Sequence, residues 1–336
     1  MEPVSRIDLH AHTTASDGML SPVALVDLAR ERGLSVLGIT DHDTIDGLAE
    51  ATVAAASSGP ALVPGVELST SIGGHDVHIL GYFIDAGDER LVAKLHARAD
   101  ARKRRVVRMV EQLRALGYPI EIEPILAQAD AGTIGRPHVA RALVDLGVVS
   151  SVGEAFDRFL QPGKPGWAPY ERFIPEEAIG LIVENRAVPV LAHPYTTGDV
   201  EATLGRLVPA GLRGLEVYYG EYSPAQHAGL LDVARRWGLL PTGGSDFHGP
   251  GFKEGRDLGT APVPEEVFTD LAALYDELTA RRVTPRMQRS PRSLSSPRGK
   301  ASGSARVARC SLKLAGGRFS PGVSMRSTAR RPFATS

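Results

Sequence analysis

Two histidines separated by a single residue stand near the beginning of the chain, in the sequence IDLHAHTTASDG. His10 and His12 follow a short apolar run, and Asp17 comes five residues after His12. Alternate residues of a β-strand point to the same side, so His10 and His12 can share one side of a strand end. Imidazole nitrogens and carboxylate oxygens are the ligands that borderline divalent metals prefer. The pattern predicts a metal site if other segments supply further ligands.

Similar side chains follow five other apolar runs of the chain. They are His42 in TDHD, Glu67 in PGVELST, His78 in HDVHILGY, His193 in LAHPY, and Asp246 and His248 in GGSDFHG. One ion takes about four to six ligands, so nine candidate groups predict two or three ions that share a carboxylate. Any one of these histidines alone would be an ordinary polar residue. His75, His96 and His227 are assigned no role.

The apolar runs that precede these residues are short and β-rich, and several are separated by helical patterns. The helix predicted over 21–33 has Ser21 as N-cap, Pro22 in the first turn and Gly33 as its stop. The repeated order of strand, loop and helix predicts parallel βα units. Seven such strands favour a closed barrel over an open sheet, although periodicity alone does not exclude the sheet. In a parallel barrel the carboxyl ends of the strands meet at one face, where sites are built.

One segment, residues 88–170, interrupts this order and is predicted to be a helical insertion. It contains a long helix over 89–117 and two shorter ones over 136–147 and 151–160. We expect it to form a cap over the mouth of a barrel built from residues 4–87 and 171–282. The fold class is therefore α/β, a distorted seven-stranded (β/α) barrel with a cap.

The composition of the last part of the chain differs from that of the rest. The 336 residues carry a net charge of −1, yet no Asp or Glu follows Glu277, and about a dozen Lys and Arg lie between Arg286 and Arg331. The basic tail 286–336, rich in Ser, Pro, Gly and Arg, is predicted to be disordered. Electrostatic contact with nucleic acid is a possible role for it, but a solvated extension is favoured.

Other features of the composition indicate a soluble intracellular protein. There is one cysteine, Cys310, so there is no intrachain disulfide. We find neither an apolar stretch long enough to cross a membrane nor the pattern of a secretory signal at the N-terminus. We expect a cytoplasmic protein with no membrane association and no stable protein partner.

The motifs DLHAHTTASDG, ITDHDT, PGVELS, GRPHVARAL and GGSDFHG together resemble the polymerase and histidinol phosphatase (PHP) family. The resemblance covers about residues 4–282 and is greatest to the branch with nucleoside 3′,5′-bisphosphate phosphatases and the bacterial 5′–3′ exoribonuclease AM. It implies a distorted seven-stranded barrel and a trinuclear metal site. The implied ligands are His10, His12, Glu67 and Asp246 for one ion; Glu67, His78 and His193 for a second; and Asp17, His42 and His248 for a third.

The chemistry expected of such a site is hydrolysis of a phosphoric ester. Divalent ions, with manganese favoured over iron or zinc, would acidify a water that attacks phosphorus as a bridging hydroxide. Glu67 is expected to bridge two ions, and Asp246 or His248 to assist the leaving oxygen. For the phosphates of the substrate we expect contacts from Arg136 and His138 in GRPHVARAL and from Arg105. Neighbouring Arg102 and Lys103 are interpreted as a solvated helix face.

The favoured substrate is a nucleoside 3′,5′-bisphosphate, with trimming of the 5′ end of short RNA as a second use of the site. One alternative is a phosphatase of histidinol phosphate or another sugar phosphate. An alternative of another class is a non-catalytic PHP module that binds nucleic acid or a protein partner. The complete set of nine metal-competent groups argues against that module.

Overall fold

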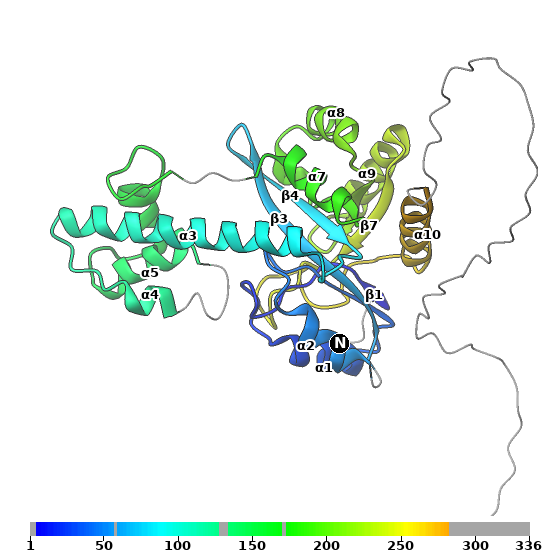
Figure 1. Ribbon diagram of the computed structural model, residues 1–336, viewed down its shortest axis with the longest axis horizontal. Coiled ribbons are helices and arrows are strands. Elements are labelled where there is room, and N and C mark those ends of the chain that lie inside the picture. Colours follow the sequence, from blue (N-terminus) through cyan, green and yellow to red (C-terminus); the bar gives the residue numbers. More distant parts are fainter. Residues whose placement is uncertain (1–4, 57–58, 128–133, 170–172, 282–336) are drawn as a thin grey trace, which may run out of the picture. The chain divides into compact units, whose positions relative to one another are not determined.

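The computed structural model describes residues 5–56, 59–127, 134–169 and 173–281, all of which belong to one compact unit, Met1–Pro285 (Figure 1). The predicted basic tail and the predicted domain boundaries at 4, 170, 171 and 282 lie outside the described residues. Among the described helices, none is long and apolar enough to cross a membrane.

Seven strands follow one another in a single sheet in the order of the chain. They are β1 (Ile7–Asp8), β2 (Val36–Ile39), β3 (Ala61–Ile72), β4 (His75–Tyr82), β5 (Val188–Leu191), β6 (Gly214–Tyr219) and β7 (Leu240–Gly244). The first and last strands meet, because Leu9 N donates a hydrogen bond to the carbonyl oxygen of Gly243. A side chain at Gly244 would place its Cβ 2.4 Å from the backbone nitrogen of His10, so this closure requires glycine. The sheet is a nearly closed barrel, as the sequence predicts.

The sequence predicts parallel strands throughout the barrel, but β4 runs in the opposite direction. β4 runs antiparallel to both β3 and β5, while the other described strand pairs are parallel. The cause is the two-glycine turn Gly73–Gly74, in which both residues have positive φ and which leads β3 straight back into β4. His78 therefore lies in the first half of its strand, and the reversal brings it to the face where the other strands end.

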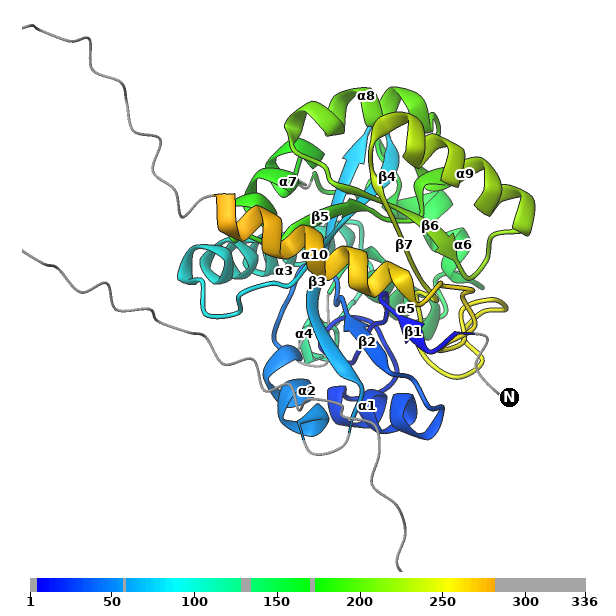
Figure 2. The same cartoon turned by 90° about the vertical axis from the view of Figure 1, so that its right-hand side faces the viewer.

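Helices surround the barrel, and the predicted N-cap Ser21 directly precedes the first of them. They are α1 (Pro22–Glu31), α2 (Leu48–Ala55), α7 (Pro175–Glu184), η3 (Pro194–Thr197), α8 (Val200–Ala210), α9 (Pro224–Trp237) and α10 (Glu266–Arg281). Ser21 and Ser223 cap α1 and α9 through side-chain oxygens that accept backbone N–H groups. Helix α10 lies across the strands (Figure 2), and its Val267 and Leu271 pack on residues near the beginnings of the parallel strands. It closes the end of the barrel opposite the carboxyl ends of the parallel strands.

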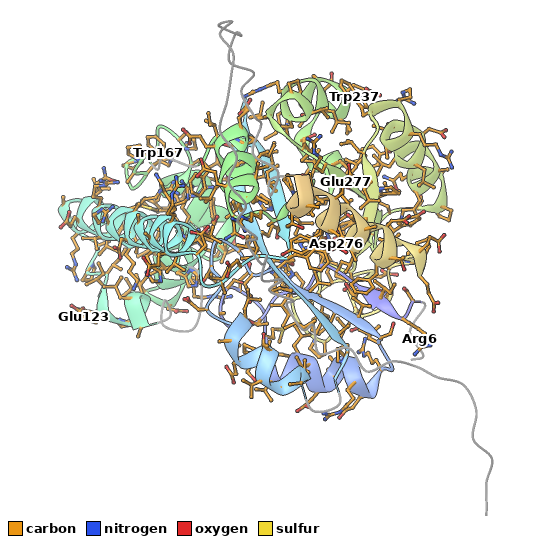
Figure 3. All side chains as sticks on the ribbon, turned by 45° about the vertical axis from the view of Figure 1, so that its right-hand side comes forward. Arg6, Glu123, Trp167, Trp237, Asp276 and Glu277 are labelled. Atoms are coloured by element: carbon orange, nitrogen blue, oxygen red, sulfur yellow. The ribbon has the colours of Figure 1, made fainter. Side chains whose placement is uncertain are left out.

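The insertion is helical and has a hydrophobic core of its own. It consists of α3 (Glu89–Ala115), α4 (Glu123–Ala127), α5 (Arg136–Asp145), α6 (Val152–Ala155) and the π-helical turn η2 (Phe156–Leu160). In Figure 3 its residues Glu123 and Trp167 lie on one side of the molecule and Trp237, on α9 of the barrel, on another. Helix α3 belongs to both cores: Leu91 and Leu95 pack in the barrel, and Val106 and Met109 in the insertion.

Candidate metal centre

The carboxylate of Glu67, in the middle of β3, is the centre of the site and is fully buried. Five imidazoles from four strands or strand ends surround it. Its Oε2 lies 3.1–3.2 Å from a ring nitrogen of His10, His12 and His42, and its Oε1 lies 2.8 Å from His78 and 2.9 Å from His193. Both oxygens of one carboxylate thus face nitrogen ligands on different sides, the arrangement that a bridging ligand needs.

Two more carboxylates stand on either side of His12 and His248. Asp246 Oδ1 lies 3.1 Å from Nε2 of His12 and 3.5 Å from Nδ1 of His248. Asp17, which is half-exposed, places Oδ1 3.4 Å from Nε2 of His248 and Oδ2 3.9 Å from Nε2 of His42. The cluster therefore extends from the buried Glu67 toward the surface at Asp17.

All nine predicted ligand residues come together in this cluster. Three groups of side chains offer ligand atoms within 4.8 Å of one another: His10, His12, Glu67 and Asp246; His42, Glu67 and His78; and His12, Asp17, His42 and His248. The first group has the composition implied by the family resemblance. The other two groups differ from those that the resemblance implies. His42 belongs to both of them, and His193, which was implied beside Glu67 and His78, contacts Glu67 but is not in either group. The division of ligands among individual ions stays a prediction.

Unusual backbone conformations aim several of these side chains. Five described residues other than glycine have positive φ, and three of them belong to the site: Asp43 at 52°, His193 at 25° and Asp246 at 55°. L-residues rarely adopt this region, and such strain is retained where surrounding structure enforces it. Here each strained residue lies two to four residues after the end of a strand, in the segments that carry the cluster.

Charge complementarity stabilises the buried carboxylates in their ionised form. Burial alone would raise the pKa of Glu67, but the surrounding imidazoles, His42 first, hold it well below its usual range. The pKa of Asp246 is likewise lowered against burial by His10 and His12. Burial opposes a charge on His12, yet Asp246 and Glu67 raise its pKa to about 10. Positive charge at the centre of the cluster thus balances the buried carboxylates of Glu67 and Asp246.

The residues fit bound divalent cations. Neither ring nitrogen of His12 makes a hydrogen bond within the described part of the chain, although both nitrogens are fully buried. Its Nε2 lies 3.1 Å from Asp246 and 3.2 Å from Glu67 without hydrogen-bond geometry. Buried polar atoms are normally paired, so unpaired atoms at such distances are those expected of ligands that converge on a common cation.

A further buried carboxylate, Glu216 on β6, supports the cluster and was missed by sequence reasoning. Its Oε1 lies 2.8 Å from Nδ1 of His10, and its Oε2 accepts a hydrogen bond of 2.6 Å from the backbone N–H of His193. The Nδ1 contact leaves Nε2 of His10 to face Glu67, which fixes the orientation of the ring. The signal in the sequence is a single acid inside the apolar run LEVYY.

Tyr219 and Arg256 hold the second oxygen of Asp246 and were also missed. The hydroxyl of Tyr219 donates to Oδ2 at 2.8 Å, and Nη1 of Arg256 lies 2.8 Å from the same atom. Oδ1 is thereby left to face the imidazoles. Arg256 also pairs with Glu221. Nothing in the sequence near Arg256 marks it, because it lies in a loop that follows β7.

Asp41, which directly precedes His42, accepts hydrogen bonds from the backbone N–H and hydroxyl of Thr13, at 2.7 and 2.8 Å, and from the hydroxyl of Ser16 at 2.6 Å. Its carboxylate thus fixes the loop that carries Asp17.

The cluster opens into a cavity of about 490 Å³ between barrel and insertion. We call it the phosphate cavity because the residues predicted to contact phosphate line it. Asp17, His42 and His78 line it from the barrel. The three residues predicted to bind substrate, Arg105, Arg136 and His138, line it from the insertion. Arg105 Nε donates to the carbonyl of Ala168, and Nδ1 of His138 accepts from the N–H of Gly135, which fixes both side chains in the wall. The structure brings the residues predicted to bind substrate to the same cavity as the predicted ligands.

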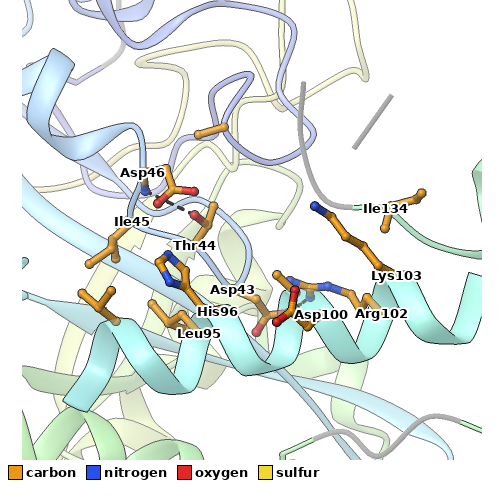
Figure 4. Close-up of a pocket in the computed structure, with 13 residues that line it drawn as sticks. Asp43, Thr44, Ile45, Asp46, Leu95, His96, Asp100, Arg102, Lys103 and Ile134 are labelled. Atoms are coloured by element: carbon orange, nitrogen blue, oxygen red, sulfur yellow. Dashed lines mark hydrogen bonds and ion pairs between the residues drawn. The ribbon is translucent and has the colours of Figure 1, made fainter. Parts of the chain in front are cut away.

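Arg102 is part of the site and not of a solvated face. Its guanidinium forms an ion pair with the buried carboxylate of Asp43, which also accepts the N–H of Ser69. Burial would raise the pKa of Asp43, but Arg102 lowers it. On the other side of this pair lies a second cavity, of about 230 Å³, between the loop after β2 and α3 (Figure 4). Asp43 and Arg102 form a shared wall between the two cavities.

Comparison with known proteins agrees with this geometry. Residues 8–126 match the model of the PHP domain. The chain is 37% identical over 287 residues to a 3′,5′-nucleoside bisphosphate phosphatase of Chromobacterium violaceum, covering 84% of this chain and 99% of that protein. The chain belongs to the PHP family. A 5′–3′ exoribonuclease of Escherichia coli is 38% identical, over 72% of this chain and 85% of its own length.

A solved structure confirms the fold. A candidate metal-dependent phosphoesterase of Bifidobacterium adolescentis superposes with a TM-score of 0.68 at 34% identity, covering 81% of this chain and 97% of that one. As a PHP enzyme the chain is a metal-dependent phosphoesterase, a hydrolase of phosphoric esters. The expectation of an enzyme is thereby confirmed over that of a non-catalytic module.

Proposed function

We propose that this PHP enzyme removes the 3′-phosphate of nucleoside 3′,5′-bisphosphates and also trims the 5′ end of short RNA. The observation that carries the proposal is the phosphate cavity, in which Arg105, Arg136 and His138 face the metal-competent cluster. A substrate with two phosphates suits it, because one phosphate can meet the cluster while the other meets the two arginines of the insertion. The relatives from C. violaceum and E. coli, named for these two activities, support the same substrate class.

We assign two or three divalent ions, with manganese favoured, to the nine predicted ligands. When bound, such ions acidify water and neutralise the charge that develops on phosphate oxygens. Glu67 is assigned the bridging position, since its two oxygens face different imidazoles. Glu216 and Arg256 hold His10 and Asp246 in place and so preserve the spacing of the ligands.

Proton transfer to the leaving oxygen is assigned to His248 in preference to Asp246. Both oxygens of Asp246 are engaged, Oδ1 with imidazoles and Oδ2 with Tyr219 and Arg256. His248 Nδ1 lies 2.8 Å from the carbonyl of Asp246, while its Nε2 faces the more open side of the cluster near Asp17. The proposal thus rests on the ring nitrogen of His248 that faces Asp17, whereas both oxygens of Asp246 are engaged.

The experiment is a comparison of substrates with metal content counted in the same samples. With manganese added, we expect adenosine 3′,5′-bisphosphate to be hydrolysed far faster than histidinol phosphate. Glu67→Ala and Asp17→Ala are expected to lose both metal and activity, whereas Asp27→Ala, an exposed acid on α1, keeps both. Faster turnover of histidinol phosphate, or full activity in Glu67→Ala, would contradict the proposal.

A further inference from the structure

The metal-competent cluster opens on a second side that a nucleoside bisphosphate does not use. A cavity of about 400 Å³, the side cavity, is lined by His193, Asp246 and His248 of the cluster and by barrel residues beyond it. Those residues are Gly74, His75, Asp76, Thr196 and Arg256. His42, Asp76 and His78 line both this cavity and the phosphate cavity, so the two meet at the cluster.

A phosphomonoester needs only one of these openings. Its 3′-phosphate is the end of the molecule, so the nucleoside and the 5′-phosphate occupy the phosphate cavity and nothing extends past the cluster. A phosphodiester carries a second ester group on the same phosphorus, and this group needs space on another side. The side cavity provides such a space. All of its lining residues belong to the barrel, whereas the phosphate cavity is also lined by residues of the insertion.

We propose that the side cavity binds the nucleotide that follows the scissile phosphate of an RNA chain, an inference that rests on the proposed function. In both substrates the oxygen of water bonds to phosphorus and the P–O3′ bond breaks. Its electron pair goes to the 3′ oxygen, which takes up a proton, and the water loses one. A bisphosphate then yields inorganic phosphate, whereas RNA yields a nucleoside 5′-phosphate and a shortened chain with a new 5′-phosphate.

The lining of the side cavity suits a nucleotide. Arg256 supplies a cation whose direction is fixed by Asp246 and Glu221. His75 is exposed at the rim, and its ring packs over Gly198, where a Cβ would approach within 3.2 Å. Exposed rings of this kind stack on unpaired bases, and arginine binds phosphate oxygens. Asp76 is an acidic group in the same lining, so its charge opposes part of that of Arg256.

The inference also gives a reason for successive cleavage from the 5′ end. The shortened chain carries a 5′-phosphate, which is the group assigned to Arg105, Arg136 and His138 in the phosphate cavity. One step forward by the RNA chain moves that phosphate from the cluster to those three side chains and brings the next phosphodiester to the cluster. The two cavities on either side of one cluster would thus set the direction of trimming.

Three substrates separate the side cavity from the rest of the site: a nucleoside 3′,5′-bisphosphate, its 3′-methylphosphate ester, and a dinucleotide with a 5′-phosphate. His75→Ala removes the ring at the rim of the cavity. We expect kcat/KM for the dinucleotide to fall about tenfold or more, the size of a lost base-stacking contact, with the other two substrates changed by less than about threefold. His75→Tyr, which keeps an aromatic ring, should show a smaller loss of the same selectivity. His96→Ala, at an exposed histidine of α3, is the matched control.

Each contrary result has a distinct meaning. If the wild-type enzyme hydrolyses the bisphosphate but not the dinucleotide, the inference is wrong and the proposed function stands. If His75→Ala cleaves the dinucleotide as well as wild type does, or lowers turnover of all three substrates equally, the inference is also wrong. If no substrate is hydrolysed by metal-loaded wild type, the proposed function itself fails.

Discussion

The guanidinium of Arg102, on the insertion, pairs with the buried carboxylate of Asp43, on the barrel. Asp43 directly follows His42 and has a φ of 52°, so the pair holds a strained residue beside a predicted metal ligand. Arg102 lies on α3 between the part of the helix that packs in the barrel core and the part that packs in the core of the insertion. The pair therefore connects the position of the cap to that of His42.

Loss of Arg102 should destabilise the protein more than loss of its neighbour Arg104. Arg102→Ala leaves the carboxylate of Asp43 buried and unpaired, which typically costs about 3–5 kcal/mol of unfolding free energy. Arg104 is exposed, so Arg104→Ala should change stability by no more than about 0.5 kcal/mol. Urea unfolding measures both. Because Arg102→Ala/Asp43→Asn removes both charges, it should regain part of the loss; a double variant as unstable as Arg102→Ala would count against this account.

Glu216→Gln should weaken metal binding while the fold is kept. The amide still fills the space of the carboxylate, but it is uncharged and has one acceptor oxygen in place of two. It therefore cannot accept from both His10 Nδ1 and the backbone N–H of His193. Outer groups of this kind typically contribute about 10- to 100-fold to metal affinity. Titration with manganese of the metal-free protein measures the change, and Glu265→Gln, an exposed acid, is the control. Equal affinity in both variants would refute the role assigned to Glu216.

Metal binding should release protons and tighten as the pH rises. In the metal-free protein, Asp246 and Glu67 overcome burial and raise the pKa of His12 to about 10, so the ring is protonated at neutral pH. Burial, followed by His12 and His78, lowers the pKa of His42 to about 4, so that ring is already neutral. A ligand nitrogen must lose its proton, so manganese affinity should rise between about pH 6 and pH 9. Calorimetry in buffers of different ionisation enthalpy counts the protons; affinity that does not vary with pH would contradict the prediction.

Arg136→Ala should discriminate between substrates with and without a 5′-phosphate. Arg136 lines the phosphate cavity, and a hydrogen bond to a charged group contributes about 1.5–3 kcal/mol. We expect KM for a nucleoside 3′,5′-bisphosphate to rise about 10- to 100-fold, while hydrolysis of a nucleoside 3′-monophosphate changes little. Arg141→Ala, on the exposed side of the same helix, provides the comparison. Similar losses on both substrates would place Arg136 outside the 5′-phosphate site.

The barrel and the cluster could be predicted because their signals are local. A histidine or acid directly after an apolar run lies at a strand end, and all such ends meet in a closed barrel. The reversal of β4 was not predicted, since parallel and antiparallel strands have the same apolar pattern. His78 nevertheless joined the cluster, because the short turn at Gly73–Gly74 returns the chain to the same face.

The supporting residues could not be predicted because their role depends on distant partners. Glu216 contacts His10 across 206 residues of sequence, and Arg102 contacts Asp43 across 59. An arginine in the run ARKRRVVR resembles its exposed neighbours until the helix is placed against the barrel. Glu216 has a weak local signal, an acid in an apolar strand, that indicates a buried partner without identifying it.

The separate core of the insertion has a consequence for how this enzyme can change. Val106, Met109, Val110 and Leu113 pack with α4–η2 and not with the strands that carry the cluster. Substitutions, insertions or exchange of the cap would therefore alter which phosphate compounds are accepted without repacking the residues that perform hydrolysis. The same barrel can acquire new substrates, in evolution or in the laboratory, by replacement of the part of the insertion that has its own core.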